Sequence, residues 1–182
     1  MGRCSYLTRW TDQTSAIELS SGVNVRTAQK ALPESLTPDL VAPCGMNCGL
    51  CRGHLRDKNR CPGCNGDDSA QPRYCLTCKI KTCDTIASGA SSFCFDCTTF
   101  PCARLRQLDR RYRTKYGMSM TENLLRIQEI GLEAFVETEQ VRWACPECGS
   151  IVCVHLPDCG VCGHPRNLSG PSNMGIEQNA RR

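Results

Sequence analysis

The sequence is poor in the large apolar side chains that usually build a protein core. Leu, Ile, Val and Phe contribute 15, 7, 8 and 4 of the 182 residues, about 19% together, and aromatic residues make up 5%. A share below about 20% is too small for a conventional core. The longest apolar run, residues 151–154, has four residues, whereas a membrane span needs about 18. The composition therefore excludes a membrane helix and predicts that something besides burial stabilises the fold.

The motifs of common enzymes are also missing. The chain has no phosphate-binding loop, dinucleotide fingerprint, HExxH motif or recognisable Ser–His–Asp set, and its 3 His are too few for most hydrolytic sites. Its CxxC pairs lie beside glycine or proline rather than between a strand and a helix, which argues against a dithiol oxidoreductase. The sequence therefore favours a protein without catalytic activity.

Nothing in residues 1–10 resembles a targeting signal. This segment has no apolar h-region and no small-residue cleavage site. Tyr6 stands where a myristoylation motif needs Ser or Thr. We therefore expect a cytoplasmic protein, in which thiols stay reduced and can bind metal. The odd number of cysteines, 17, also argues against a closed set of disulfides.

Cysteine is the abundant residue, at 17 of 182 or about 9%. This share is typical of scaffolds held together by disulfides or metal ions. The expected fold class is a small metal-stapled α+β protein with an irregular cysteine-rich module, a helical segment and a C-terminal zinc ribbon. The expected parts are a flexible extension (1–43), the metal-binding module (44–102), the helical segment (103–142), the zinc ribbon (143–165) and a disordered tail (166–182).

Helical periodicity begins after the module. Apolar residues recur at helical spacing and Gly117 supplies a stop, which predicts one amphipathic helix; these residues are Leu105, Leu108, Tyr112 and Tyr116. Ser119 and Glu122 form a capping-box pattern that begins a second helix. Gly131 closes or kinks that helix. A short helix over residues 26–32 is also compatible with the sequence.

The most specific pattern is a pair of CxxC motifs separated by ten residues, with glycine after each second cysteine: Cys145, Cys148, Cys159 and Cys162. Zinc prefers four tetrahedral thiolate or imidazole ligands, and each CxxCG turn presents two sulfurs. We therefore expect a structural zinc ion here. Residues 150–155 between the motifs look like a strand, on which we expect Cys153 to be a small buried residue and His155 to pack against its neighbours.

Eleven cysteines lie in the module: Cys44, Cys48, Cys51, Cys61, Cys64, Cys75, Cys78, Cys83, Cys94, Cys97 and Cys102. Two copies of CxxCxxxxC, offset by 19 residues, form an internal repeat. Spacing alone leaves the grouping into sites open. One economical grouping makes two tetrathiolate sites, the first from Cys61, Cys64, Cys75 and Cys78 and the second from Cys83, Cys94, Cys97 and Cys102.

The remaining triplet, Cys44, Cys48 and Cys51, would lie on one face of a helix, and His54 would continue that face. One interpretation makes His54 the fourth ligand of a zinc ion. The other makes the triplet the ligands of an iron–sulfur cluster with a non-cysteine fourth position. The spacing also matches radical enzymes that use S-adenosylmethionine, but no repeated strand–helix alternation follows it, so we reject that interpretation.

The order of the motifs resembles an uncharacterised cysteine-rich prokaryotic family, domain of unknown function 3795. The resemblance covers about residues 42–163 and depends on CGMNCGLC, CPGC, CLTCKIKTC and CFDCTTFPC in this order, the last followed by Ala-Arg-Leu. It implies metal binding and indicates no substrate.

Six basic residues against Asp109 give the first predicted helix a candidate phosphate-binding face: Arg104, Arg106, Arg110, Arg111, Arg113 and Lys115. A solvent-exposed helix surface is the favoured explanation, because few aromatic residues lie between the basic ones and the net charge is only +4.

We therefore expect a zinc-binding interaction or regulatory module whose partner is another protein rather than nucleic acid. The alternative is an iron–sulfur protein for electron transfer or redox sensing.

Overall fold

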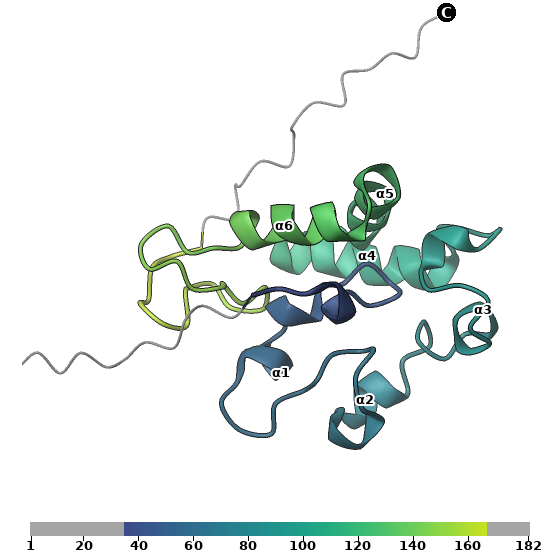
Figure 1. Cartoon of the computed structure of the whole chain (residues 1–182), viewed down its shortest axis with the longest axis horizontal. Coiled ribbons are helices and arrows are strands. Elements are labelled where there is room, and N and C mark those ends of the chain that lie inside the picture. The colour runs from purple at the N-terminus through teal and green to yellow at the C-terminus, as the bar shows by residue number, and fades with distance from the viewer. Residues whose placement is uncertain (1–34, 167–182) are drawn as a thin grey trace, which may run out of the picture. The chain divides into compact units, whose positions relative to one another are not determined.

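The computed structural model describes residues 35–166, all within one compact unit. The α-helices are α1 (Arg52–Leu55), α2 (Arg73–Leu76), α3 (Asp84–Ala87), α4 (Ala103–Tyr116), α5 (Met120–Ile130) and α6 (Leu132–Arg142) (Figure 1). Single 3-10 turns are η1 (Pro38–Leu40), η2 (Cys48–Leu50), η3 (Asp68–Ala70) and η4 (Cys94–Asp96). None of the helices in this range is long and apolar enough to cross a membrane. The expected helix over 26–32 lies outside the described residues.

The β-structure of the expected α+β fold does not form between residues 35 and 166. This range contains isolated bridges in place of strands: Val41 with Asn47, Ala144 with Ile151, and Asp158 with Pro165. The strand predicted over 150–155 is lost because its amides have different partners. Val152 N–H donates to Trp143 O (2.8 Å), whereas Val154 N–H donates to Leu50 O (2.9 Å). The described residues are therefore helical and irregular.

The long helices begin and end where the sequence predicts. Gly117, with φ +63°, ends α4 in the left-handed conformation that glycine adopts readily. Ser119 caps α5 by accepting a hydrogen bond from the Glu122 N–H (3.0 Å). Gly131 separates α5 from α6 with φ +85°. These local signals were readable because each acts within one turn of the helix that it begins or ends.

The hydrophobic core lies around α5, which contacts α4, α6 and η4. The largest fully buried apolar side chains are Phe135, Leu50, Leu105, Met118, Met120, Leu124, Val41 and Val154. Leu36 and Leu40 are buried in the same core, and η1 contacts α6. The packed part of the chain therefore begins before residue 43, the predicted last residue of the flexible extension.

Buried hydrogen bonds connect the helices to one another and to the cysteine-rich module. Asp109 of α4 accepts from the Ser119 hydroxyl (2.8 Å) and from the Thr121 N–H (3.0 Å). The Asn123 side chain of α5 donates to Gly45 O (2.9 Å). A buried polar group without a partner destabilises the folded state by about 1–3 kcal/mol. The hydrogen bond from Asn123 therefore holds the segment around Gly45 in one position on α5.

Gly45 lies against α5 so closely that a side chain would not fit. It has φ +82°, and a Cβ would lie 2.6 Å from Met120 O and 2.8 Å from Leu124 Cγ. Gly89 is a matched control, since it has φ +71° but a Cβ there would meet nothing within 4 Å. We expect Gly45→Ala to reduce stability by about 1–3 kcal/mol more than Gly89→Ala. Thermal unfolding followed by circular dichroism measures this, and equal shifts in the two variants would contradict the close approach.

Candidate metal centres

Two similar turns build the group formed by Cys145, Cys148, Cys159 and Cys162, hereafter the C-terminal quartet. In each turn the N–H of the closing glycine donates to the carbonyl of the first cysteine, at 2.8 Å in one and 2.9 Å in the other. These glycines, Gly149 and Gly163, have φ +70° and +74°, in the region that favours glycine. Each turn therefore holds its two cysteines in a fixed local geometry.

The four sulfurs of the C-terminal quartet all lie within 4.8 Å of one another. Cys145 Sγ is 3.6 Å from Cys162 Sγ, and Cys148 Sγ is 3.7 Å from Cys159 Sγ. Tetrahedral zinc with Zn–S bonds of about 2.3 Å places its sulfurs about 3.8 Å apart. The quartet could therefore hold one metal ion. Between residues 35 and 166, no other group of three or more His, Cys, Asp or Glu ligand atoms is this close.

One sulfur of the quartet is held in its metal-binding form. The Ser150 hydroxyl lies 3.4 Å from Cys148 Sγ, and this contact, helped by the Ser150 N–H, lowers the pKa of Cys148 to about 5. Thiolates rather than thiols bind metal. Cys145 and Cys159 are buried while Cys162 is exposed, so the centre lies at the edge of the core.

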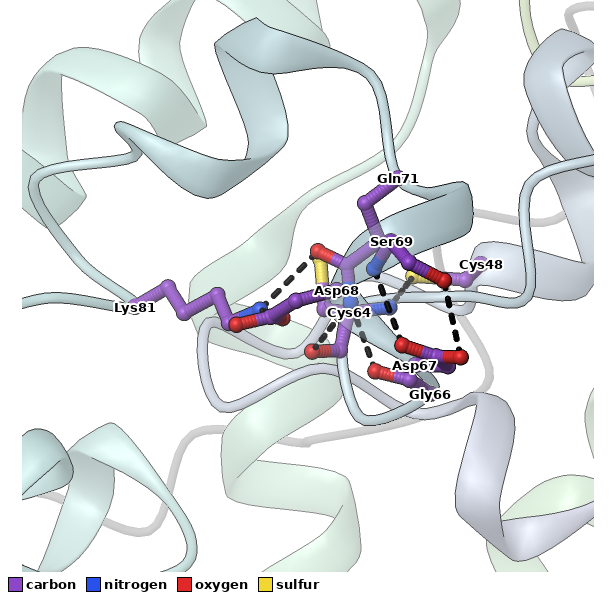
Figure 2. Close-up of polar contacts among 8 residues, drawn as sticks. All are labelled: Cys48, Cys64, Gly66, Asp67, Asp68, Ser69, Gln71 and Lys81. Carbon is purple, nitrogen blue, oxygen red and sulfur yellow. Dashed lines mark hydrogen bonds and ion pairs between the residues drawn. The ribbon is translucent and has the colours of Figure 1, made fainter.

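In the module, a first group of cysteines gathers around Cys48 and Cys64. The Cys64 N–H donates to Cys48 Sγ (3.4 Å) (Figure 2). The contact with the Cys48 thiol, together with the smaller effect of the Lys81 ammonium, lowers the pKa of Cys64 to about 7. Burial raises the pKa of Cys44, and the sulfurs of Cys64, Cys78 and Cys94 add to that effect. Cys44, Cys48, Cys64 and Cys78 are therefore neighbours.

A hydrogen-bonded loop next to Cys64 holds Lys81 in place. Gln71 Nε2 donates to Gly66 O (2.8 Å), and Lys81 Nζ donates to Gln71 Oε1 (2.9 Å) and Asp68 Oδ1 (2.6 Å) (Figure 2). The ammonium therefore stays close to a cysteine group, where it favours thiolate. Sequence reasoning missed Lys81 because no spacing pattern connects it to a cysteine.

A second group surrounds Gly53. The Gly53 N–H donates to Cys51 Sγ (3.4 Å), and a Cβ at Gly53 would lie 3.5 Å from Cys61 Cβ and 3.9 Å from Tyr74 Oη. Burial raises the pKa of Cys75 to about 12, with further contributions from Cys64, Cys61, Cys51 and Cys78, in this order. Cys51 and Cys61 are therefore gathered at the start of α1, and Cys75 lies between this group and the group around Cys48 and Cys64.

A third group lines a cavity of about 350 Å³ next to α3 and η4. Its cysteines are Cys83, Cys94, Cys97 and Cys102. Burial raises the pKa of Cys94 to about 12, and the other three sulfurs are among the neighbours that raise it further. These four residues are the second quartet that the sequence analysis derived from spacing.

The other expected groupings are brought together only in part: Cys61, Cys64 and Cys78 all lie near Cys75, but the triplet is divided. Cys44, Cys48 and Cys51 do not share a helix face, because η2 ends at Leu50 and Cys51 starts α1. Cys48 therefore faces Cys64, while Cys51 caps α1. The pair Cys61 and Cys64 is split in the same way, one residue beside Gly53 and the other beside Cys48.

His54 lies within the module but lines a surface that carries no cysteine. Its Nδ1 donates to Cys61 O (2.8 Å), which leaves Nε2 chemically able to bind metal. However, the residue lines an open surface depression of about 520 Å³ whose other lining residues are Ser35, Thr37, Asp39, Leu40, Arg60 and Pro62. No cysteine lines this depression.

Cys153 and His155 lie next to α1. Cys153 is 4% exposed, as expected for a small buried residue. His155 packs edge-on against Tyr112 and Tyr116, with ring centroids 5.7 and 4.9 Å away, which confirms the packing prediction. Its Nδ1 accepts from the Arg52 N–H (3.3 Å), and its Nε2 lies 3.1 Å from Tyr112 Oη. Burial lowers the pKa of His155, which favours the neutral ring.

Comparison with known proteins gives one family. The model of the family described as "Protein of unknown function (DUF3795)" matches residues 40–107. The match includes all eleven cysteines of the module and the start of α4, but it ends well before the C-terminal quartet, whereas the expected resemblance extended to residue 163. No curated protein and no solved structure matches the chain. Residues 40–107 are thus similar to the DUF3795 family, as the order of the cysteine motifs predicted.

Proposed function

We propose that this protein is a zinc-binding, cysteine-rich interaction module without catalytic activity. The observation that carries the proposal is the C-terminal quartet, whose shortest sulfur–sulfur distances, 3.6 and 3.7 Å, match those of one tetrahedral ion. In a multi-iron cluster the cysteines are shared among several iron atoms, which spreads the sulfurs apart. Mononuclear zinc, in the form of a zinc ribbon, therefore fits this site better.

The state of the cysteines supports a reducing compartment. All 16 cysteines between residues 35 and 166 are free thiols. Thiols at this density persist where glutathione and thioredoxin keep them reduced, and metal ions then stabilise the fold in place of disulfides. We therefore propose that the protein functions in the cytoplasm.

The basic residues of α4 support a protein partner rather than nucleic acid. Arg104 donates to Lys79 O (3.3 Å), and Arg106 donates to Pro101 O (2.6 Å). Arg113 lies 3.8 Å from Asp109 and 3.4 Å from Glu122. Because three of the six basic side chains make hydrogen bonds or ion pairs within the chain, the face offers a phosphate backbone less charge than the sequence suggests.

Metal analysis of protein purified without oxygen tests the proposal. We expect several equivalents of zinc per chain, no acid-labile sulfide and no visible absorption, because zinc has a filled d shell and no redox chemistry. Elemental analysis by mass spectrometry, a sulfide assay and a visible spectrum measure these quantities. Stoichiometric iron and sulfide with a brown colour would instead support an iron–sulfur protein for electron transfer or redox sensing, and protein without bound metal would contradict both functions.

A further inference from the structure

The number of thiols in the described residues suggests more sites than the C-terminal quartet. Residues 35–166 hold 16 cysteines. The quartet uses four, and the twelve that remain are what three further tetrathiolate sites require. The module supplies eleven of them, and the twelfth is Cys153, which lies between the two turns of the quartet. This step rests on the proposed function, since it assumes that the cysteines bind metal.

Two backbone contacts bring Cys153 to the second cysteine group. The Val154 N–H donates to Leu50 O (2.9 Å), so Cys51 and Cys153 flank the two peptide groups that this hydrogen bond joins. The neighbouring Arg52 N–H donates to His155 Nδ1 (3.3 Å). The two residues that follow Cys153 are therefore fixed against the two residues that flank Cys51.

The electrostatics of Cys51 agree with this placement. Burial is the main cause that raises its pKa, and among neighbouring thiols Cys153 contributes most, ahead of Cys61. Cys153 itself is 4% exposed. A sulfur so deeply buried beside other thiols is not an isolated surface thiol.

We propose that Cys51, Cys61, Cys75 and Cys153 form one tetrathiolate metal site, interleaved with a second site formed by Cys44, Cys48, Cys64 and Cys78. In either site, no three of the sulfurs lie within 4.8 Å of one another. A change of χ1 rotamer moves a cysteine sulfur by about 3 Å, so closing each site requires such a change at more than one of its cysteines. The third site is formed by the cysteines that line the cavity beside α3.

In this arrangement the two sites share three segments of the chain. Each segment contains two cysteines in CxxC spacing, and each pair contributes one cysteine to each site: Cys48 with Cys51, Cys61 with Cys64, and Cys75 with Cys78. Both sites then depend on the same three chain segments, so loss of either metal loosens the ligands of the other. Through its bound metal ion, Cys153 would also connect the module to the segment that carries the C-terminal quartet.

The competing candidate for the fourth ligand is His54. Its unprotonated Nε2 could bind zinc, but the residue lines a depression without cysteines. The two candidates predict different donor sets. Cys153 gives four sulfurs, whereas His54 gives three sulfurs and one nitrogen.

Substitution with alanine separates the two candidates. Alanine preserves a small apolar side chain at position 153, so a packing role would lose no metal. We expect Cys153→Ala to bind one metal ion fewer than the wild type in native mass spectrometry, and the matched variant His54→Ala to keep all of them. Full metal content in Cys153→Ala, or loss of one ion in His54→Ala, would overturn the proposal.

A measurement on the wild type keeps the proposal falsifiable if Cys153→Ala does not fold. In protein loaded with cadmium-113, scalar coupling connects each metal to the β-protons of its own cysteines. We expect one cadmium signal that correlates with Cys51, Cys61, Cys75 and Cys153. A cadmium signal that correlates with three cysteines and the His54 ring would overturn the inference while leaving the proposed function intact. A wild type that binds no cadmium or zinc would overturn the proposed function itself.

Discussion

Cys148→Ser is expected to remove one metal ion per chain and to unfold residues 143–165. Cys148 belongs to the C-terminal quartet, whose sulfurs all lie within 4.8 Å, and Ser150 already favours its thiolate form. A structural zinc ion contributes on the order of 10 kcal/mol to the folding of a small site. Side chains such as Val154 pack in the core, but the backbone of this segment has isolated bridges, such as that from Ala144 to Ile151, in place of the expected strand.

Native mass spectrometry and hydrogen exchange together measure this loss. Four amides of the quartet donate hydrogen bonds within its turns and are expected to lose protection: Cys145, Gly149, Cys159 and Gly163. The Asn123 N–H of α5, which donates to Ser119 O (3.1 Å), is expected to stay protected, because α5 packs between α4 and α6.

The control for this variant is Cys4→Ser. Cys4 lies outside the described residues, and its isolated position in the sequence predicts a thiol that binds no metal. We expect this variant to keep full metal content and full protection. A Cys148→Ser protein with the metal content of the wild type and four protected amides would show that the quartet does not need the metal.

The features that could be predicted from the sequence are those that depend on local geometry, namely the C-terminal quartet and the ends of the long helices. The C-terminal quartet was readable because each CxxCG turn positions two sulfurs within five residues, and two such turns complete a tetrahedral site. The ends of α4 and α5 were readable for the same reason, because Gly117 and Ser119 act on the turn beside them.

The grouping that we propose for the module could not be predicted from spacing, because it depends on backbone contacts between distant residues. Spacing places Cys61 and Cys64 in one site, since they share a CxxC turn. In the structure the Cys61 N–H bonds Gly53 O (2.8 Å), while the Cys64 N–H bonds Cys48 Sγ (3.4 Å). Each of these bonds joins residues 8 or more positions apart, and no periodic pattern encodes such a pairing. The same holds for the contact of Val154 with Leu50, which brings Cys153 to α1.

Pairs of substitutions in the module are expected to distinguish the interleaved grouping from the grouping by spacing. If Cys48 and Cys64 bind the same ion, each single serine variant loses one metal and the double variant Cys48→Ser/Cys64→Ser also loses only one. If Cys61 and Cys64 bind different ions, Cys61→Ser/Cys64→Ser loses two. Metals counted by native mass spectrometry give these numbers directly.

The grouping by spacing predicts the opposite pattern. It places Cys61 and Cys64 in one site, so their double variant would lose one metal, and it separates Cys48 from Cys64, so that double variant would lose two. The double variants are matched controls for each other, since both contain Cys64→Ser and remove the same number of thiols. One metal lost from the Cys61/Cys64 variant and two from the Cys48/Cys64 variant would refute the interleaved arrangement, because the hydrogen bond from Cys64 to Cys48 Sγ would then join two separate sites.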